Sequence, residues 1–380
     1  MIYLDNAATT SIEPMAAEFM HYISVCGNPS SIHRMGKNGR KLIDTAKELI
    51  KAYFNTSEGD IIFTSGGTEA NNLAILGIAE YLKKIGKTTI ITSKIEHLSV
   101  LNVCKELENR GFHVIYMPVC YDGRIDIEEL DKIMCQNHDT LGLVSIQSVN
   151  SEIGTKQNIE DIGFLCTEHG ALFHTDAVQA INQMKIDIDK CHIDMMSISG
   201  HKIGTPMGIG ALYVRDKTLL SPIMFGGGQE YGLRSGTENL IGISAMAGAF
   251  YYLQGAFDVN QKIITSLRAY MIEKIDEHMT VPYYINCFDG SNHLISLTIP
   301  KVEGNSLMLM LNENGICVST GSACSANKLE SSYVLKAIGI DDKEAICTIR
   351  ISLSHHNTKE EIEIAARKIA ELSAKLYELI

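Results

Sequence analysis

The fold is decided by the stretch IIFTSGGTEANNLAILGIAEYLKKIGKTTIITS, residues 61–93. It contains a short apolar run (IIFTS), a helical pattern over residues 68–84, and a second, β-branched run (TTIITS). Short apolar runs that alternate with helices of this length are typical of parallel strands joined by covering helices. The stretch therefore predicts one strand–helix–strand unit of an α/β sheet.

The same alternation continues over residues 35–215. Five further runs resemble strands: HVIYMPV (113–119), LVSIQSV (143–149), ALFHTD (171–176), DMMSIS (194–199) and GIGALYV (208–214). A short apolar run can also belong to a buried helix, so the α/β class rests on the repeated alternation and not on any single run. We expect a large, mainly parallel sheet covered on both faces, with functional groups where strands end.

The pattern changes after the glycine-rich stretch FGGGQEYGLRSG (225–236). Two helical patterns follow, over residues 238–253 and 261–278, and then shorter strand and helix patterns up to a closing helix from Thr358. We expect a large domain over residues 15–255. A smaller α+β domain would combine residues 1–14 and 256–380 and carry a loop at about 319–332.

Composition limits the classes of function. The 380 residues are 45% hydrophobic and 21% charged, which is typical of a globular protein, and the net charge is 33 − 45 = −12. This charge argues against nucleic acid or an anionic membrane as the main partner. The first residues lack the basic and apolar regions of a secretory signal, and the weakly polar stretch 240–253 is too short to span a bilayer. We therefore expect a cytoplasmic protein.

The chain has ten cysteines but no C-x-x-C pair. Cysteines that are scattered in this way are more typical of reduced thiols than of a disulfide framework. We expect free thiols and no metal site.

One lysine stands out, in SISGHKIG (197–204). Lys202 directly follows an apolar run, so its amine is expected at the end of a buried strand beside Ser199 and His201. A desolvated lysine can form a Schiff base with a carbonyl compound. The alternative is a solvated loop lysine.

Three other strand ends carry polar groups. In FTSGGTEANN (63–72) a helix begins after two glycines, which is typical of a phosphate cradle, although Thr68 could simply be a helix cap. Asp176 ends an apolar strand with Gln179 three residues on, so it is expected to pair with a cationic ring nitrogen, or else to form a salt bridge or cap. His97 offers a flat ring, or is a core or capping histidine.

These groups are close enough in the chain to share one sheet edge. Asp176 and Lys202 are 202 − 176 = 26 residues apart, which corresponds to one helix and one strand. A phosphate cradle, a carboxylate for a pyridinium nitrogen and an amine for a Schiff base are the requirements of a pyridoxal phosphate site.

Nine motifs support this prediction and resemble a known family. The motifs are YLDNAATT (3–10), GNPSSIHRMG (27–36), FTSGGTEANN (63–72), SKIEH (93–97), SEIGTKQ (151–157), HTDAVQ (174–179), SGHK (199–202), LRSGTEN (233–239) and STGSACSA (319–326). In this order they resemble the group I, NifS/IscS-type cysteine desulfurases, which have the class V aminotransferase fold. The resemblance extends from Tyr3 to about Thr358.

The resemblance implies roles for individual residues. Lys202 would bind pyridoxal phosphate as a Schiff base, Asp176 would pair with the pyridine nitrogen, and Gln179 would contact the phenolic oxygen. His97 would stack on the ring as a catalytic residue. The full cofactor-binding set would be Gly67, Thr68, Ser151, Asp176, Gln179, Ser199, His201, Lys202 and Thr237.

Substrate and sulfur would be handled by other residues. Arg350, between two apolar neighbours, would bind the substrate carboxylate with Asn28, although a surface salt bridge is the alternative for the arginine. Cys324 would take the sulfur of L-cysteine as a persulfide, release L-alanine, and pass the sulfur to an iron–sulfur scaffold or a thiolation enzyme. Thr237 would reach the phosphate bound by the partner subunit, which implies a homodimer.

Four places depart from the family pattern. Ser151 replaces an asparagine, and Gly204, Thr205 and Met207 replace most of a Tyr-Gly-Pro-Lys segment, which would remove a cation beside the cofactor. Tyr231 and His355 each replace an arginine. Alternatives therefore include a selenocysteine lyase, another C–S lyase or a transaminase of the same fold, and a weakly active scaffold member.

Overall fold

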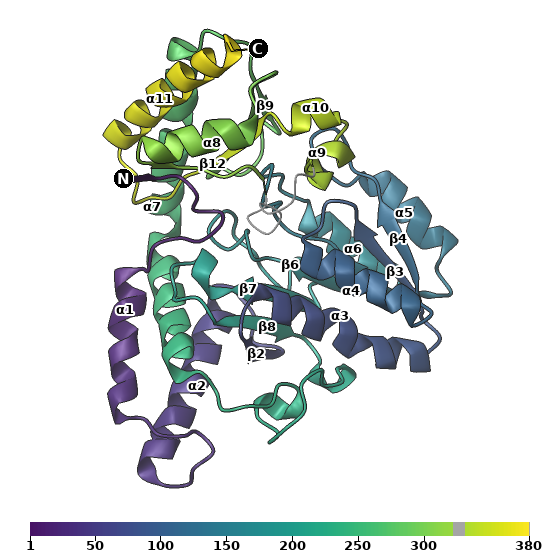
Figure 1. Ribbon diagram of the computed structural model, residues 1–380. Coiled ribbons are helices and arrows are strands. Elements are labelled where there is room, and N and C mark those ends of the chain that lie inside the picture. The colour runs from purple at the N-terminus through teal and green to yellow at the C-terminus, as the bar shows by residue number, and fades with distance from the viewer. Residues whose placement is uncertain (322–330, 380) are drawn as a thin grey trace.

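The computed structural model describes residues 1–321 and 331–379. In Figure 1 the large sheet and the helices that cover it form the lower part of the molecule, and a smaller group of strands and helices forms the upper part. Helix α7 (Leu240–His278) runs along one side of both groups. The two chain ends lie at the small group.

The large sheet has seven strands in the order β2-β8-β7-β6-β5-β3-β4. Their bounds are β2 Asp60–Thr64, β3 Thr89–Ser93, β4 His113–Met117, β5 Leu141–Ser145, β6 Leu172–Asp176, β7 Met195–Ser199 and β8 Gly210–Val214. β3 to β7 pair in parallel, whereas β8 is antiparallel to β2 and β7. The prediction of a mainly parallel α/β sheet is confirmed.

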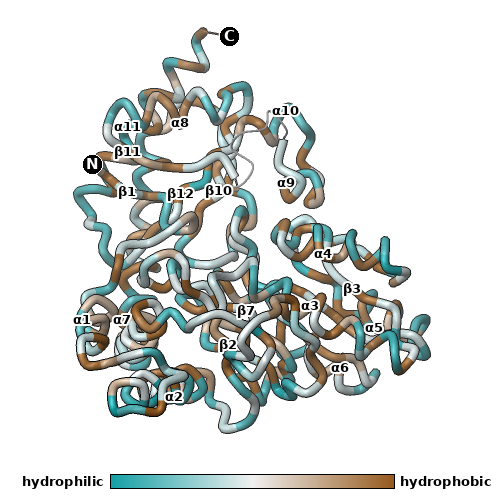
Figure 2. The backbone as a smooth tube through the Cα atoms, turned by 60° about the horizontal axis from the view of Figure 1, so that its bottom comes forward, coloured by the Kyte–Doolittle hydropathy of each residue, from teal (hydrophilic) through white to brown (hydrophobic). Residues whose placement is uncertain are grey.

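Each face of this sheet is covered by helices. On one face α3 (Gly67–Lys84) and α4 (Leu98–Asn109) pack over residues such as Met195 and Leu212. On the other face α2 (Arg34–Tyr53), α5 (Ile127–Gln136), α6 (Ile159–Glu168) and the first part of α7 pack over residues such as Met196 and Tyr213. Because successive strand residues point to opposite faces, a strand buried on both sides is apolar throughout. Figure 2 shows hydrophobic residues gathered along the strands.

The small group forms a separate core. Strands β12 (Thr348–Ser352), β10 (Leu294–Thr298) and β9 (Tyr284–Asn286) form an antiparallel sheet, and β1 (Ile2–Tyr3) pairs with β11 (Ile316–Cys317). Helices α8 (Gly304–Glu313) and α11 (Lys359–Tyr377) cover it, and α9 (Tyr333–Ala337) and α10 (Asp342–Ala345) lie beside it. Leu4 belongs to this core, whereas Ala16, in α1 (Pro14–Met20), packs in the large core.

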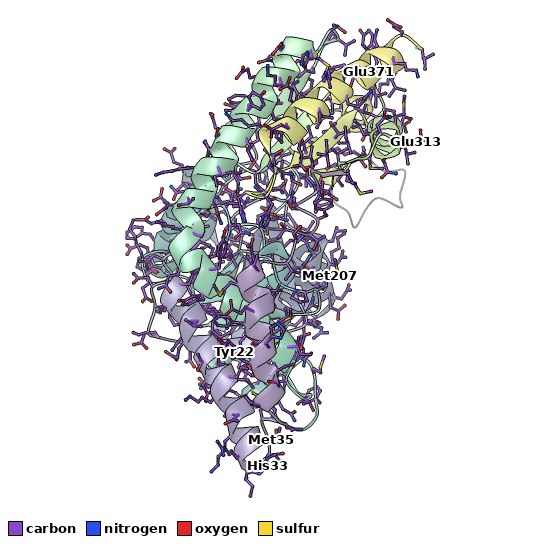
Figure 3. The ribbon with its side chains drawn as sticks, turned by 90° about the vertical axis from the view of Figure 1, so that its left-hand side faces the viewer. Tyr22, His33, Met35, Met207, Glu313 and Glu371 are labelled. Carbon is purple, nitrogen blue, oxygen red and sulfur yellow. The ribbon has the colours of Figure 1, made fainter. Side chains whose placement is uncertain are left out.

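Helix α7 corrects one prediction. The two helical patterns expected over residues 238–253 and 261–278 are one 39-residue helix, and the expected domain limit at residue 255 lies inside it. The residues between the patterns, 254–260, include no proline, so the helix does not break. One 18-residue window of α7 is apolar enough to cross a membrane, but 56% of it is buried inside the protein. Helix α7 packs against α1, α2 and α11. Figure 3 shows α7 beside α1 and α2.

The large sheet predicts a pH dependence of stability through His174. This histidine is completely buried in β6, with its ring nitrogens 2.8 Å from Ser145 Oγ and 3.0 Å from Ser197 Oγ. Burial lowers the pKa of His174 from 6.5 to about 3. Below pH 6.5 the unfolded chain therefore binds a proton that the folded chain does not, and stability falls as the pH falls toward 3. Between pH 6.5 and 5, His174 is expected to lower the free energy of unfolding by about 2 kcal/mol.

Urea unfolding of wild type and His174→Gln at pH 6.5 and 5 measures this effect. The variant should lose less stability on acidification. Burial also lowers the pKa of His293 to about 3 and, with Lys202, that of His201 to about 4, and these contributions stay. His113→Gln changes an exposed histidine of β4 and is the control. An identical pH dependence in His174→Gln and wild type would contradict the prediction.

Candidate active site

A cavity of about 220 Å³ lies at the carboxyl ends of β6 and β7, between the large sheet and β12. The following predicted residues line it: Gly67, Thr68, His97, Ser151, Asp176, Gln179, Ser199, His201, Lys202 and Arg350. They come from six separate segments of the chain. The cavity is where a sheet of this class is expected to bind its ligand.

Lys202 lies in a short turn, η2 (Gly200–Lys202), directly after β7. Its Nζ donates hydrogen bonds to the carbonyl oxygens of Ala7 (2.5 Å) and Ala8 (2.7 Å). The Ala7 carbonyl also accepts from Gln179 Nε2 at 2.8 Å. The alternative of a solvated loop lysine is therefore wrong, because the amine is held at the cavity by the N-terminal segment.

Asp176 is a buried carboxylate at the end of β6, 7% exposed. It accepts hydrogen bonds from Asn71 Nδ2 (2.7 Å) and from the backbone N–H of Val178 (3.0 Å). Within the described part of the chain, no lysine, arginine or histidine forms a salt bridge with it, so the salt-bridge alternative is wrong. A buried carboxylate is costly without a cationic partner. The cavity has room for such a partner beside Asp176.

His97 is both a cap and a cavity residue. It is the N-cap of α4, and its Nδ1 accepts a hydrogen bond from the backbone N–H of Ser99 at 3.1 Å. Because Nδ1 is the acceptor, the neutral ring carries its proton on Nε2. The capping alternative is correct, and it fixes the orientation of a ring that also lines the cavity.

Asn71, which the sequence analysis missed, joins His97 to Asp176. Its Nδ2 donates to Asp176 Oδ2 (2.7 Å) and to Ser99 Oγ (2.8 Å), and Ser99 Oγ lies 2.7 Å from His97 Nδ1. Asn71 is 1% exposed and lies one helical turn after Thr68. An asparagine on the otherwise apolar face of this helix is the sequence feature that could have identified it.

The start of α3, which lines the cavity at Gly67 and Thr68, can hold an anion. The N-cap of α3 is Gly66, which provides no side-chain cap, so the proposed capping role of Thr68 is wrong. A Cβ at Gly67 would lie 2.6 Å from Val178 Cγ2, so the helix can begin this close to Val178 only with glycine. The free N–H groups of this helix start, with the hydroxyl of Ser199 nearby, form a suitable phosphate cradle.

His201 also lines the cavity. Its Nδ1 is buried and has no hydrogen-bond partner among the described residues. Burial and the adjacent Lys202 lower the pKa of His201 to about 4, so the ring is neutral at pH 7. A phosphate oxygen would supply the missing partner.

Arg350 is buried in β12, at 2% exposure, so the surface salt-bridge alternative is wrong. Its Nη2 donates to Asp5 Oδ1 (2.8 Å) and its Nη1 to the backbone carbonyl of Ser151 (2.9 Å). Its Nε has no partner among the described residues. The guanidinium is thus fixed in position and retains a donor for a carboxylate.

Three predicted residues are not placed in this cavity. Asn28 and Thr237 are exposed and do not line it, and Cys324 lies outside the described residues. Met207 is 70% exposed, lies at the edge of the molecule in Figure 3, and does not line the cavity. The inference that its replacement of a lysine removes a cation beside the cofactor is therefore wrong for the single chain.

The site fits pyridoxal phosphate. It offers an amine at Lys202, an unpaired buried carboxylate at Asp176, and a helix start beside the unpartnered Nδ1 of His201. These three features match the carbonyl, the pyridinium nitrogen and the phosphate of the cofactor.

Comparisons with known proteins agree with this assignment. Residues 2–364 match the aminotransferase class-V family model. The chain is 41% identical over 387 residues to the cysteine desulfurase IscS of Proteus mirabilis, covering 100% of this chain and 94% of that protein. It is also similar to a solved NifS-like protein (34% identity, TM-score 0.89, 98% and 99% coverage). The solved structure of SspA in complex with cysteine gives 36% identity, a TM-score of 0.81, and 94% and 100% coverage.

The Asn71 network predicts an effect on cofactor affinity. Asn71→Ala removes a donor from the buried carboxylate of Asp176, and a hydrogen bond to a charged group is worth about 1.5–3 kcal/mol. We expect roughly 10- to 100-fold weaker binding of pyridoxal phosphate, measured by absorbance titration of the cofactor-free protein. Asn72→Ala is the matched control, because among the described residues the neighbouring asparagine donates only to the Thr68 carbonyl. Equal affinity in both variants would exclude this role.

Proposed function

This chain belongs to the class-V aminotransferase family, and from that premise we propose that it is a pyridoxal phosphate-dependent cysteine desulfurase, which converts L-cysteine into L-alanine and transferable sulfur. The observation that carries the proposal is the convergence of Lys202, Asp176 and Arg350 on one cavity. The similarity to cysteine desulfurases over the whole chain supports the substrate. The match to a structure described with bound cysteine supports it further.

Bound pyridoxal phosphate supplies an electron sink that stabilises negative charge on the α-carbon of an amino acid. The protein positions the groups around it. Arg350 binds the substrate carboxylate with its free Nε, while Asp5 and the Ser151 carbonyl hold the guanidinium still. Lys202 would accept the proton from the α-carbon, and the buried carboxylate of Asp176 would pair with the ring nitrogen of the cofactor.

The sulfur step is assigned to Cys324. Its thiolate attacks the sulfur of L-cysteine, an S–S bond forms, and the Cβ–S bond breaks with its electron pair left on the substrate. The substrate thiol proton is taken up at Cβ to complete L-alanine. The enzyme retains a persulfide with the negative charge, so no external oxidant or reductant is required.

The sulfur acceptor and the cellular location are part of the same proposal. We infer that the persulfide sulfur passes to an acceptor protein, either an iron–sulfur scaffold or a thiolation enzyme, in the cytoplasm. The net charge of −12 and the likeness to proteins named IscS support this inference.

A homodimer is also proposed. Thr237 and Asn28 are exposed and lie outside the cavity of their own chain, and the apolar ring of Phe225, at the start of the glycine-rich stretch that precedes Thr237, is 82% exposed. Exposed apolar residues beside polar site residues are typical of an interface. In the dimer, Thr237 would complete the phosphate pocket of the partner subunit.

Two variants separate cofactor binding from sulfur transfer. Lys202→Ala should abolish both the absorbance of the lysine-bound cofactor and the formation of alanine. Cys324→Ser should retain that absorbance and the spectral response to L-cysteine, because both depend on Lys202, Asp176 and Arg350, but should yield almost no alanine or transferable sulfur. Mass spectrometry of wild type after treatment with cysteine should place one added sulfur on the Cys324 peptide.

Other outcomes would overturn these assignments. Wild-type turnover in Cys324→Ser, or the added sulfur on Cys317, would exclude Cys324 as the acceptor. Keto acid as the main product would favour the transaminase alternative, and faster reaction with selenocysteine would favour the lyase alternative.

The dimer predicts an effect of Thr237. Analytical ultracentrifugation should show a dimer for wild type and for Thr237→Ala, because the substitution removes one hydroxyl and not the interface. The variant should bind pyridoxal phosphate about tenfold more weakly, as expected for the loss of one hydrogen bond to a charged group. A monomer with full cofactor occupancy would contradict the proposal.

A further inference from the structure

Two of the departures from the family pattern, Gly204 and His355, lie on either side of Glu13. The backbone N–H of Glu13 donates to the Gly204 carbonyl at 2.9 Å. Gly204 has a φ of +84°, and a Cβ at this position would lie 2.4 Å from Glu13 Cγ. Glu13 can therefore take up its position only because residue 204 is glycine.

The carboxylate of Glu13 faces two histidines. Its Oε1 lies 3.3 Å from His355 Nε2 and 3.2 Å from His356 Nε2, and the side chain is only 6% exposed. These are the salt bridges that Glu13 makes within residues 1–321 and 331–379. A buried carboxylate is costly without a positive partner. A cation bound by one carboxylate oxygen and two imidazole nitrogens would provide that partner.

The spacing of these atoms also suits a metal ion. The His356 Nε2–Glu13 Oε1 contact is a hydrogen bond of 3.2 Å, at the long end of the range for N–H···O bonds. Zinc bonds to histidine nitrogen and carboxylate oxygen are about 2.0–2.2 Å, so two ligands in tetrahedral geometry are roughly 3.3–3.5 Å apart. All three ligand atoms of Glu13, His355 and His356 lie within 4.8 Å of one another.

We propose that Glu13, His355 and His356 bind a divalent transition-metal ion, with Zn²⁺ as the preferred ion. Two imidazoles and one carboxylate are a donor set that zinc accepts. A neighbouring cavity of about 30 Å³, lined by Glu13, His355 and Lys202, has room for a water molecule as the fourth ligand. The Tyr252 hydroxyl, 3.3 Å from His355 Nε2, borders the site.

The position of this site suggests a structural role. Glu13 ends the N-terminal segment whose Ala7 and Ala8 carbonyls hold Lys202, and His355 follows β12, which carries Arg350. A metal ion would connect these two segments close to the cavity. It would stabilise their positions without contacting the substrate.

Zinc binding to the holoenzyme tests the proposal. Protein with bound cofactor is treated with chelator, dialysed, and titrated with ZnCl₂ by calorimetry, with bound zinc counted by mass spectrometry. Wild type should bind one zinc ion per chain at this site and gain thermal stability. His356→Gln, which changes a partly exposed ligand, and His355→Arg, which restores the family residue, should each bind this ion at least tenfold more weakly.

A second cluster in the chain provides the control. Asp131, Cys135 and His169 also lie within 4.8 Å of one another, but the His169–Asp131 contact is 2.7 Å, the length of an ordinary hydrogen bond. His169→Gln should leave zinc binding unchanged.

Several results would overturn the proposal. These are no zinc bound by wild type, full zinc binding in both His355→Arg and His356→Gln, or loss of zinc in His169→Gln. Substitution with Co²⁺ distinguishes the ligands, because a cobalt–thiolate charge-transfer band would assign the metal to cysteine. None of these readouts depends on desulfurase activity, so failure here leaves the proposed function untouched.

Discussion

The hydrogen bonds from Lys202 Nζ to the carbonyl oxygens of Ala7 and Ala8 hold the active site together. The same N-terminal segment donates from the Ala7 N–H to Ser352 Oγ and accepts an ion pair from Arg350 at Asp5. It therefore connects the end of β7 in the large sheet with β12 in the small one. The segment therefore helps to fix the amine of Lys202 relative to the guanidinium of Arg350.

The cavity contains polar groups that the protein alone does not satisfy. Asp176 is buried without a cation, and His201 Nδ1 and Arg350 Nε have no partner within the described chain. Each such group lowers the stability of the folded protein. They lie in one cavity, and each is complementary to a different part of a cofactor or a substrate, which explains why they are tolerated.

Local sequence patterns identified most of the site because its residues follow strands. Lys202 and Asp176 stand directly after apolar runs, and a parallel sheet brings such ends to one edge. Asn71 was missed because its importance depends on Asp176, which is 105 residues away. Glu13 was missed for the same reason, since its partners His355 and His356 follow more than 340 residues later.

The sequence by itself determined the α/β class, the strand ends that carry chemistry, and the family, because strand and helix periodicity and motif order are properties of neighbouring residues. Tertiary structure alone decided that His97 caps a helix while facing the cavity and that Arg350 is buried against Asp5. These outcomes depend on which distant segments of the chain pack together. Packing determines the burial and the hydrogen-bond partners of each residue, and a local sequence pattern does not contain this information.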